Sequence, residues 1–272
     1  LISVGGSILE SRWYTVDGGI TNHTFAGTAG NITQVAWDAL AEGNVNLIVY
    51  LNDTIGNIVS DEVIIIKDTT APSIQIITPI VSGVYGNSAP LFVVEISDNY
   101  IVDSMWYSFN NESTNYMFTT NGTITQAAWN PFLSGSVNII FYAVDSVGNL
   151  NSKEILLQKD VINPVITILE PEMNGIFGRF APAFQISVDD INLDEVWYTL
   201  NGLNDIAVPL FTGALSQTVW ESLPDGPITL TFSANDTAGN IGLRNVIIYK
   251  DLGEPSPPDQ PDIMLIFIII GV

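Results

Sequence analysis

The sequence predicts an all-β protein made of tandem β-sandwich domains, and three observations support this prediction. First, a set of landmark residues recurs three times at intervals of about 92 residues, close to the roughly 100 residues of one sandwich. Second, apolar and polar side chains alternate along several stretches, which is the period of a half-buried strand. Third, turn sequences rich in Gly, Asn and Asp separate these stretches, and no segment keeps a helical period over three turns.

The landmarks occur in the same order in each copy: a Trp-Tyr pair, a second tryptophan, an Asp-x-x-Gly-Asn turn and a closing Lys-Asp pair. They begin at Trp13, Trp37, Asp53 and Lys67 in the first copy, at Trp106, Trp129, Asp145 and Lys159 in the second, and at Trp197, Trp220, Asp236 and Lys250 in the third. Repeat arrays use their extended surfaces more than a single pocket. The repetition therefore favours a structural or binding role over catalysis.

The alternation places the individual strands. In the stretch 228–235, the apolar positions are expected to face the core, and the stretches 45–52 and 137–144 match it. The inward sets are Ile228, Leu230, Phe232, Ala234; Val45, Leu47, Val49, Leu51; and Val137, Ile139, Phe141, Ala143. Further strands are predicted at 63–67, 73–77, 91–97, 105–109, 155–159, 165–169, 183–188, 196–200 and 246–250.

Proline-containing junctions after each Lys-Asp pair divide the chain into sandwich domains at 1–67, 68–159 and 160–250. Domain 1 lacks counterparts of residues 73–90, so we interpret the chain as a fragment, although domain 1 could instead borrow its first strand. Residues 251–262 contain four prolines and predict an extended spacer. The apolar run 263–272 is shorter than the roughly 20 residues that span a bilayer, and we interpret it as the start of a truncated transmembrane helix.

Composition restricts the partners and the compartment. The chain has 29 acidic and 7 basic residues, a net charge of −22, which opposes binding to nucleic acid or anionic lipid and attracts cations. Cysteine is absent, so disulfides and zinc-thiolate sites are excluded. Six N-x-S/T sequons fit an exported glycoprotein, and their acceptors are Asn22, Asn31, Asn52, Asn111, Asn121 and Asn235.

Calcium is the one cofactor that we consider, and no other is indicated. The ion prefers six to eight oxygen ligands, and single aspartates gather near the domain junctions and in the loops that follow a strand. The candidate ligands are Asp68, Asp98, Asp160, Asp189 and Asp190. The alternative is a solvated acidic surface. The aspartates of the Asp-x-x-Gly-Asn turns are interpreted as turn caps instead.

The tryptophans favour packing over recognition. Because all six recur in register, we predict that they belong to the core, and stacking on sugar rings is the alternative. Catalytic residues are not indicated. His23 occurs in one repeat only, and the neighbouring carboxylates Asp189-Asp190 and Asp194-Glu195 are expected to point to opposite faces of a strand. We predict that this segment is not an enzyme.

The Trp-Tyr strand, the strand that ends in Asp-x-x-Gly-Asn and the Lys-Asp-x-x-x-Pro junction resemble the tandem Ig-like repeats of archaeal and bacterial cell-surface proteins. The resemblance covers residues 1–250, and it implies stalks, adhesins, surface-layer components or envelope receptors. Antibody-type domains differ, because this chain has no cysteine pair.

The sequence thus predicts an extracellular, glycosylated stalk that one C-terminal helix anchors in the membrane. The first alternative is an adhesion module that binds a protein or glycan partner. The second is a calcium-bridged surface-layer subunit, which would form homo-oligomers. Nucleic acid is not an expected partner.

Overall fold

The computed structural model describes residues 8–110 and 113–253, and these residues form β-strands connected by turns and three one-turn helices. By compactness the described residues divide into two units. One unit comprises the residues up to 80 with 91–122 and 138–155, and the other comprises 81–90, 123–137 and those from 156 onward. Because the two units alternate along the chain between residues 81 and 155, each sheet is described by itself. We name the residues up to 67 repeat 1, 68–159 repeat 2 and 160–250 repeat 3.

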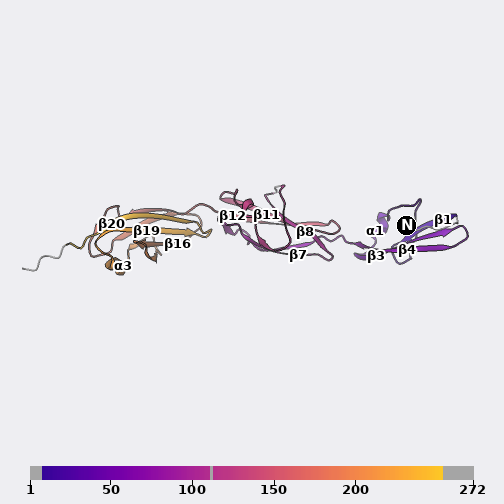
Figure 1. Cartoon of the computed structure of the whole chain (residues 1–272), viewed down its shortest axis with the longest axis horizontal. Coiled ribbons are helices and arrows are strands. Elements are labelled where there is room, and N and C mark those ends of the chain that lie inside the picture. The colour runs from indigo at the N-terminus through magenta and orange to yellow at the C-terminus, as the bar shows by residue number, and fades with distance from the viewer. Residues whose placement is uncertain (1–7, 111–112, 254–272) are drawn as a thin grey trace, which may run out of the picture. The chain divides into compact units, whose positions relative to one another are not determined.

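Repeat 1 contains one sheet in the order β2-β1-β3-β4 (Figure 1). Its elements are β1 (Leu9–Thr15), β2 (His23–Thr24), α1 (Gln34–Asp38), β3 (Gly43–Asp53) and β4 (Ile58–Lys67). Within the described residues, repeat 1 has no counterpart of the second sheet of the other repeats. The inward-facing Val63 of β4 is accordingly exposed (51%), whereas its counterpart Val246 in repeat 3 is buried (6%).

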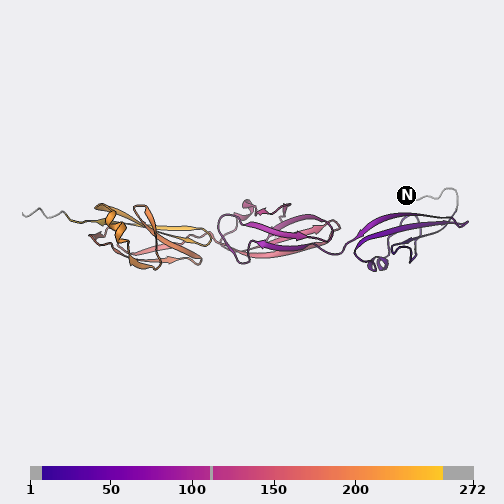
Figure 2. The same cartoon turned by 90° about the horizontal axis from the view of Figure 1, so that it is seen from below.

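Repeat 2 contains a three-stranded sheet, β10-β7-β5, and a five-stranded sheet, β6-β12-β11-β8-β9. Its strands are the magenta ribbons of Figure 2. Its elements are β5 (Ser73–Thr78), β6 (Val84–Tyr85), β7 (Leu91–Ser97), β8 (Val102–Phe109), β9 (Tyr116–Phe118), β10 (Gly122–Thr123), α2 (Gln126–Trp129), β11 (Gly135–Asp145) and β12 (Leu150–Lys159). The short strand β6 pairs parallel to β12, and the other pairs are antiparallel.

Repeat 3 has the same topology, with sheets in the orders β13-β15-β18 and β14-β20-β19-β16-β17. Its elements are β13 (Val165–Glu170), β14 (Ile176–Phe177), β15 (Ala183–Asp189), β16 (Leu193–Leu200), β17 (Leu203–Ala207), β18 (Thr212–Ala214), α3 (Gln217–Ser222), β19 (Gly226–Asp236) and β20 (Ile241–Lys250). The strand β17 pairs with β16 and therefore belongs to the five-stranded sheet. In antibody constant domains the corresponding strand joins the other sheet, so the topology differs from that class.

Every predicted strand is present, and most extend by one to five residues beyond the predicted bounds. The prediction omitted the two-residue strands and the helices, because elements of one turn or less carry no readable period. It also assigned no bounds to the longer strands β1, β9, β17 and β18. The three helices each contain the second tryptophan of a repeat, and side-chain N-caps start two of them, at Thr33 and Ser216.

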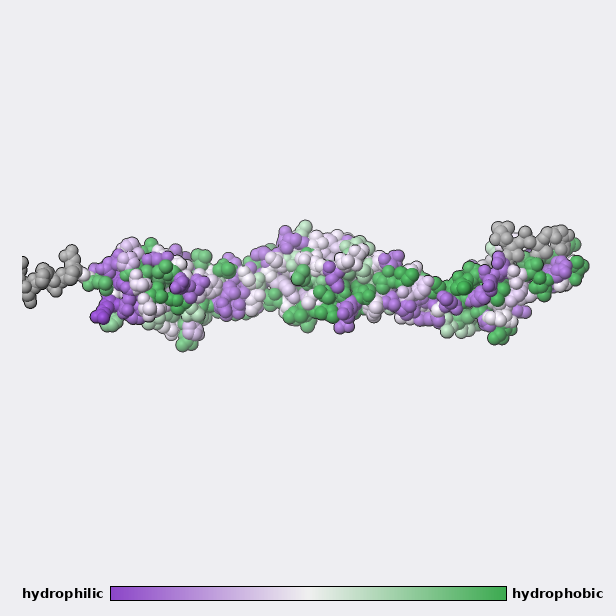
Figure 3. Space-filling view, turned by 60° about the horizontal axis from the view of Figure 1, so that its bottom comes forward, coloured by the Kyte–Doolittle hydropathy of each residue, from purple (hydrophilic) through white to green (hydrophobic). Residues whose placement is uncertain are grey.

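The core lies between the two sheets of a repeat. In repeat 2 the ring of Phe92 on β7 lies 5.6 Å from that of Phe141 on β11. In repeat 3 the inward set of β19 is fully buried, as predicted, together with Trp220 and Ile248. Burying one such large apolar side chain contributes about 1.5–3 kcal/mol. On the face shown in Figure 3, hydrophobic and hydrophilic residues are intermixed.

The prediction that all six tryptophans are core residues is wrong for four of them. Trp129 and Trp220 are fully buried, but the tryptophans of the three Trp-Tyr pairs are only partly buried and Trp37 is intermediate. Neighbouring strand residues point to opposite faces, and in each pair the tyrosine faces the core: Tyr14, Tyr107 and Tyr198 are 5%, 2% and 2% exposed. The tryptophans of these pairs are Trp13, Trp106 and Trp197.

Candidate functional site

A buried lysine closes each repeat. The Lys159 Nζ donates hydrogen bonds to the carbonyl oxygens of Trp129 (2.8 Å) and Asn130 (3.5 Å) at the end of α2, and it lies 5.1 Å from the centroid of the Trp129 ring. Burial lowers the pKa of this amino group. The Trp129 carbonyl oxygen also accepts a bond from the backbone N–H of Phe132 (3.2 Å), and the ammonium group adds a second bond at the C-terminal end of the helix, where a cation is favoured. Equivalent bonds join Lys67 to Trp37 and Leu40, and Lys250 to Trp220 and Leu223.

The Asp-x-x-Gly-Asn turns are capped as predicted. Asp145 Oδ1 accepts hydrogen bonds from the backbone N–H groups of Val147, Gly148 and Asn149 at 2.7–2.9 Å, and Oδ2 accepts one from the Asn149 side chain at 2.7 Å. Burial raises the pKa of the Asp145 carboxyl, but these hydrogen bonds outweigh it and hold that pKa below its ordinary value. Asp145 is therefore an ionised acceptor at neutral pH.

The segments that follow Lys67 and Lys159 are bonded to the next repeat. Asn149 Nδ2 also donates to the carbonyl oxygen of Asp68 (3.2 Å), and in repeat 3 Asn240 Nδ2 donates to that of Asp160 (3.0 Å). Lys67, the residue before Asp68, is bonded to repeat 1. Consecutive residues of the junction are thus anchored to different repeats.

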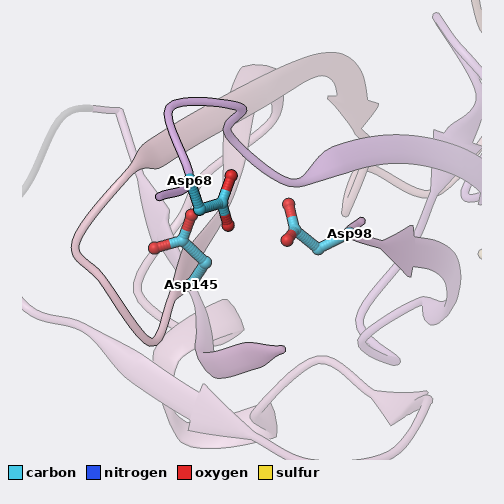
Figure 4. Close-up of side chains that lie close together, drawn as sticks. All are labelled: Asp68, Asp98 and Asp145. Carbon is cyan, nitrogen blue, oxygen red and sulfur yellow. The ribbon is translucent and has the colours of Figure 1, made fainter. Parts of the chain in front are cut away.

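Three aspartates converge next to the first junction (Figure 4). Asp68 follows β4, Asp98 follows β7 and Asp145 ends β11, and each offers a carboxylate oxygen within 4.8 Å of the other two. The Oδ1 atoms of Asp68 and Asp98 accept hydrogen bonds from the backbone N–H groups of Thr70 (3.0 Å) and Tyr100 (2.8 Å). Their Oδ2 atoms are buried and have no hydrogen-bond partner among the described residues, and Asp68 as a whole is 9% exposed.

A second cluster of the same kind is formed by Asp160, Asp190 and Asp236. It differs in one contact. Asn192 Nδ2 donates to Asp160 Oδ2 at 2.6 Å, whereas in the first cluster Asn99 Nδ2 donates to the other oxygen, Oδ1 of Asp68, at 3.3 Å. In the second cluster Oδ2 of Asp160 therefore accepts a hydrogen bond from an amide, whereas Oδ2 of Asp68 in the first cluster has no donor among the described residues.

Four of the five predicted calcium ligands lie in these clusters, Asp68 with Asp98 and Asp160 with Asp190. Asp189 belongs to neither cluster. It is the last residue of β15, and its side chain is exposed. Whether an ion binds there stays a prediction.

The sequence reasoning missed the third member of each cluster, Asp145 and Asp236, because it treated turn capping as their whole role. A signal was available. Both turns end a long strand at the edge of the sandwich where the loop with Asp98 or Asp190 also lies, so the repeat itself brings the three positions together.

The residues considered for catalysis lie apart. His23 stacks on Tyr14 in repeat 1, with ring centroids 5.0 Å apart. Asp194 and Glu195 both contribute to the lining of one open groove in repeat 3, and the pairing register of β16 with β19 shifts between Leu193 and Glu195. That the two side chains face opposite sides of the strand stays a prediction.

This groove has a volume of about 660 Å³, and its lining includes Trp197, Asp205, Phe211 and Asn235. Trp13 and Trp106 stack on the cross-strand tyrosines Tyr50 and Tyr142 with ring centroids 5.2 and 5.3 Å apart. Opposite Trp197 stands Ser233 instead, so the stacking partner is missing in repeat 3.

The sequon asparagines that belong to the described residues lie at the surface. Asn22, Asn31 and Asn121 are exposed, and Asn52 and Asn235 are partly exposed. Asn111 and the apolar run 263–272 lie outside the described residues. Among the described residues, no helix has the length and apolar character needed to cross a membrane.

No protein-family model matches the chain, and no curated protein matches it. Among solved structures it resembles the fibronectin(III)-like modules of Clostridium thermocellum CbhA, with 14% identity, 66% of this chain and 95% of that chain covered, and a TM-score of 0.40. It also resembles part of a 1.5-MDa bacterial ice-binding adhesin, with 12% identity, coverage of 92% and 89%, and a TM-score of 0.41. A tetra-tandem repeat from the extending region of a large adhesion protein has 17% identity, coverage of 89% and 66%, and a TM-score of 0.34. These neighbours are tandem sandwich repeats, like this chain, and at such low similarity they carry no argument about its activity.

Proposed function

We propose that this chain belongs to an extracellular surface protein whose repeats act as a stalk, anchored in the membrane through residues 263–272. The observation that carries the proposal is the repeated bonding of the junctions. A buried lysine fixes the chain to one repeat, and the next residue is held by an asparagine of the following repeat. A junction whose consecutive residues are bonded to different repeats suits a spacer that must keep its extension.

Composition supports the same role. A net charge of −22 keeps such a chain soluble and apart from its own copies. The accessible sequons support glycosylation.

The location is tested by labelling intact cells that produce the protein with a membrane-impermeant biotin reagent. We expect labelling of the 272-residue chain and recovery in the membrane fraction. A matched variant that ends at Asp251 should be released into the medium. Protection of the full chain from the reagent would contradict an extracellular location, and retention of the shortened variant on the cells would contradict the proposed anchor.

The bracing is tested by small-angle scattering on the Asn149→Ala, Asn240→Ala double variant. Removing both amides should broaden the distribution of intramolecular distances, while Asn44→Ala, at an exposed position of β3, should not. An unchanged distribution in the double variant would argue against bonded junctions as the source of stiffness.

The groove in repeat 3 favours adhesion to a glycan as a second candidate function. A half-exposed indole beside carboxylates suits a sugar ring, whose face stacks on the indole and whose hydroxyls donate to the acids. Trp197→Ala should then abolish binding on a glycan array, and Trp106→Ala, whose ring already stacks on Tyr142, should not. An array without any signal for the unaltered chain would refute this candidate.

A further inference from the structure

We infer that Asp68, Asp98 and Asp145 form a calcium site, and that the cluster of Asp160, Asp190 and Asp236 is a weaker counterpart of it. All three carboxylates of the first cluster belong to one compact unit, so the site does not depend on how the two units are placed. Figure 4 shows the side chains of Asp68 and Asp98 turned toward each other.

The distances suit one ion. Calcium binds oxygen at about 2.3–2.6 Å, so two oxygens on one ion lie no more than about 5 Å apart. In the first cluster, one carboxylate oxygen from each of the three aspartates lies within 4.8 Å of those from the other two.

The buried oxygens supply the second, independent reason. Asp68 is 9% exposed, and its Oδ2 atom, like that of Asp98, is buried without any hydrogen-bond donor among the described residues. Buried carboxylate oxygens are stable when they are paired or when they bind a cation. The hydrogen-bond donors around the cluster are backbone N–H groups and amides, which leave its negative charge in place. A divalent cation would satisfy both open oxygens at once.

The two clusters should bind unequally. In the second cluster the Asn192 amide already occupies Oδ2 of Asp160, the oxygen that corresponds to the open Oδ2 of Asp68. An ion there must displace this amide. The affinity of the second site should therefore be lower, and it should rise when Asn192 loses its amide.

The site rests on the proposed function in one respect: an extracellular location supplies the calcium that would fill it. Binding itself is measured on the purified chain and is independent of location. A chain that binds calcium but is protected from surface labelling would contradict only the proposed location.

The test is calorimetric titration of the calcium-free 272-residue chain with CaCl₂, in 0.15 M NaCl with MgCl₂ present to suppress diffuse binding to the acidic surface. We expect one saturable strong site. Asp68→Asn should abolish it, and Asp98→Asn should lower its affinity at least about tenfold. Asp189→Asn is the matched control, since it removes one exposed carboxylate outside both clusters and should change nothing. Asp145→Asn is not used, because it would also remove the turn cap.

A gain-of-function variant completes the test. Asn192→Ala should tighten the second site at least about tenfold, so that a second strong equivalent appears in the titration. Circular dichroism of each variant checks folding, and a folded Asp98→Asn variant suffices if Asp68→Asn does not fold. The inference is overturned if the unaltered chain shows no saturable calcium binding, or if Asp189→Asn weakens binding as much as Asp98→Asn does. Saturable binding with equal strength at both sites would overturn the proposed inequality.

Discussion

In the Trp-Tyr pairs of repeats 1 and 3, the hydroxyl group of the inward-facing tyrosine accepts a backbone hydrogen bond. The hydroxyl oxygen of Tyr14 accepts a hydrogen bond from the backbone N–H of Thr33 (2.8 Å), and that of Tyr198 accepts one from Ser216 (2.7 Å). Thr33 and Ser216 are the N-caps of α1 and α3, so in both repeats the tyrosine connects its own sheet to the helical turn. A buried hydroxyl is tolerated only with such a bond.

The two tryptophan positions of a repeat should consequently differ in energetic weight. Trp129→Ala removes a fully buried ring and the hydrogen bond from its indole nitrogen to the Gly86 carbonyl oxygen (2.9 Å), and it should destabilise repeat 2 by about 3–5 kcal/mol. Trp106→Ala removes a cross-strand stack on the outer face and should cost about 0.5–1 kcal/mol. Urea-dependent hydrogen exchange of peptides from β11 measures both values. Equal losses would show that the buried Trp129 of α2 and the outer-face Trp106 of β8 have the same energetic weight.

At the scale of the element, the Asp-x-x-Gly-Asn turn joins the two longest strands of each repeat. In repeat 2 the aspartate side chain bonds three successive N–H groups, and this arrangement requires Gly148 at φ +100°. Only glycine adopts such a φ without strain. The same geometry recurs at Gly56 (φ +89°) and Gly239 (φ +84°), so the turn is a shared element of all three repeats.

Gly148→Ala should therefore destabilise the β11–β12 hairpin, by about 1–2 kcal/mol, because an alanine would be held in a left-handed conformation. Gly122→Ala is the matched control. Gly122 has no positive φ, and a β-carbon there would meet no atom within 4 Å, so this variant should be neutral within about 0.5 kcal/mol. Thermal unfolding followed by circular dichroism compares them. A neutral Gly148→Ala would mean that the turn relaxes at no cost.

At the scale of the whole molecule, the repeats are unequally supported within the described residues. In repeats 2 and 3 a short parallel strand pairs with the last strand, and a three-stranded sheet covers the core. The described part of repeat 1 has neither, and its buried cluster comprises Tyr14, Val16, Ala36 and Val45. The counterpart of buried Leu157 is Ile65, which is only partly buried.

Amides of β4 should therefore exchange with deuterium at least about tenfold faster than those of β12 and β20, since local opening is easier where fewer apolar contacts hold a strand. Exchange of the 272-residue chain, followed by mass spectrometry of peptides from the three strands, provides the comparison. The pair β12 and β20 serves as the internal control and should exchange alike. Equal protection of β4 would mean that repeat 1 is as well supported as the others.

The threefold repeat, the positions of most strands and most of their core-facing residues could be predicted from the sequence alone. These features are local: an alternation of period 2 identifies a strand and groups its residues by face, and a glycine after Asp-x-x specifies the turn. For this reason Ile228, Leu230 and Phe232 were assigned correctly without any tertiary information. The turn aspartates were recognised as caps for the same reason.

Three features depend on tertiary packing: which ring of each Trp-Tyr pair is buried, which carbonyl oxygens the closing lysine contacts, and which aspartates lie close together. Alternation gives two opposite faces but does not say which one a second sheet covers, and the choice between Trp106 and Tyr107 depends on that sheet. The aspartate cluster joins Asp68, Asp98 and Asp145, residues far apart in the chain. Their proximity follows from the pairing and packing of strands, which no local pattern encodes, and this is why sequence reasoning included Asp189 and missed Asp145.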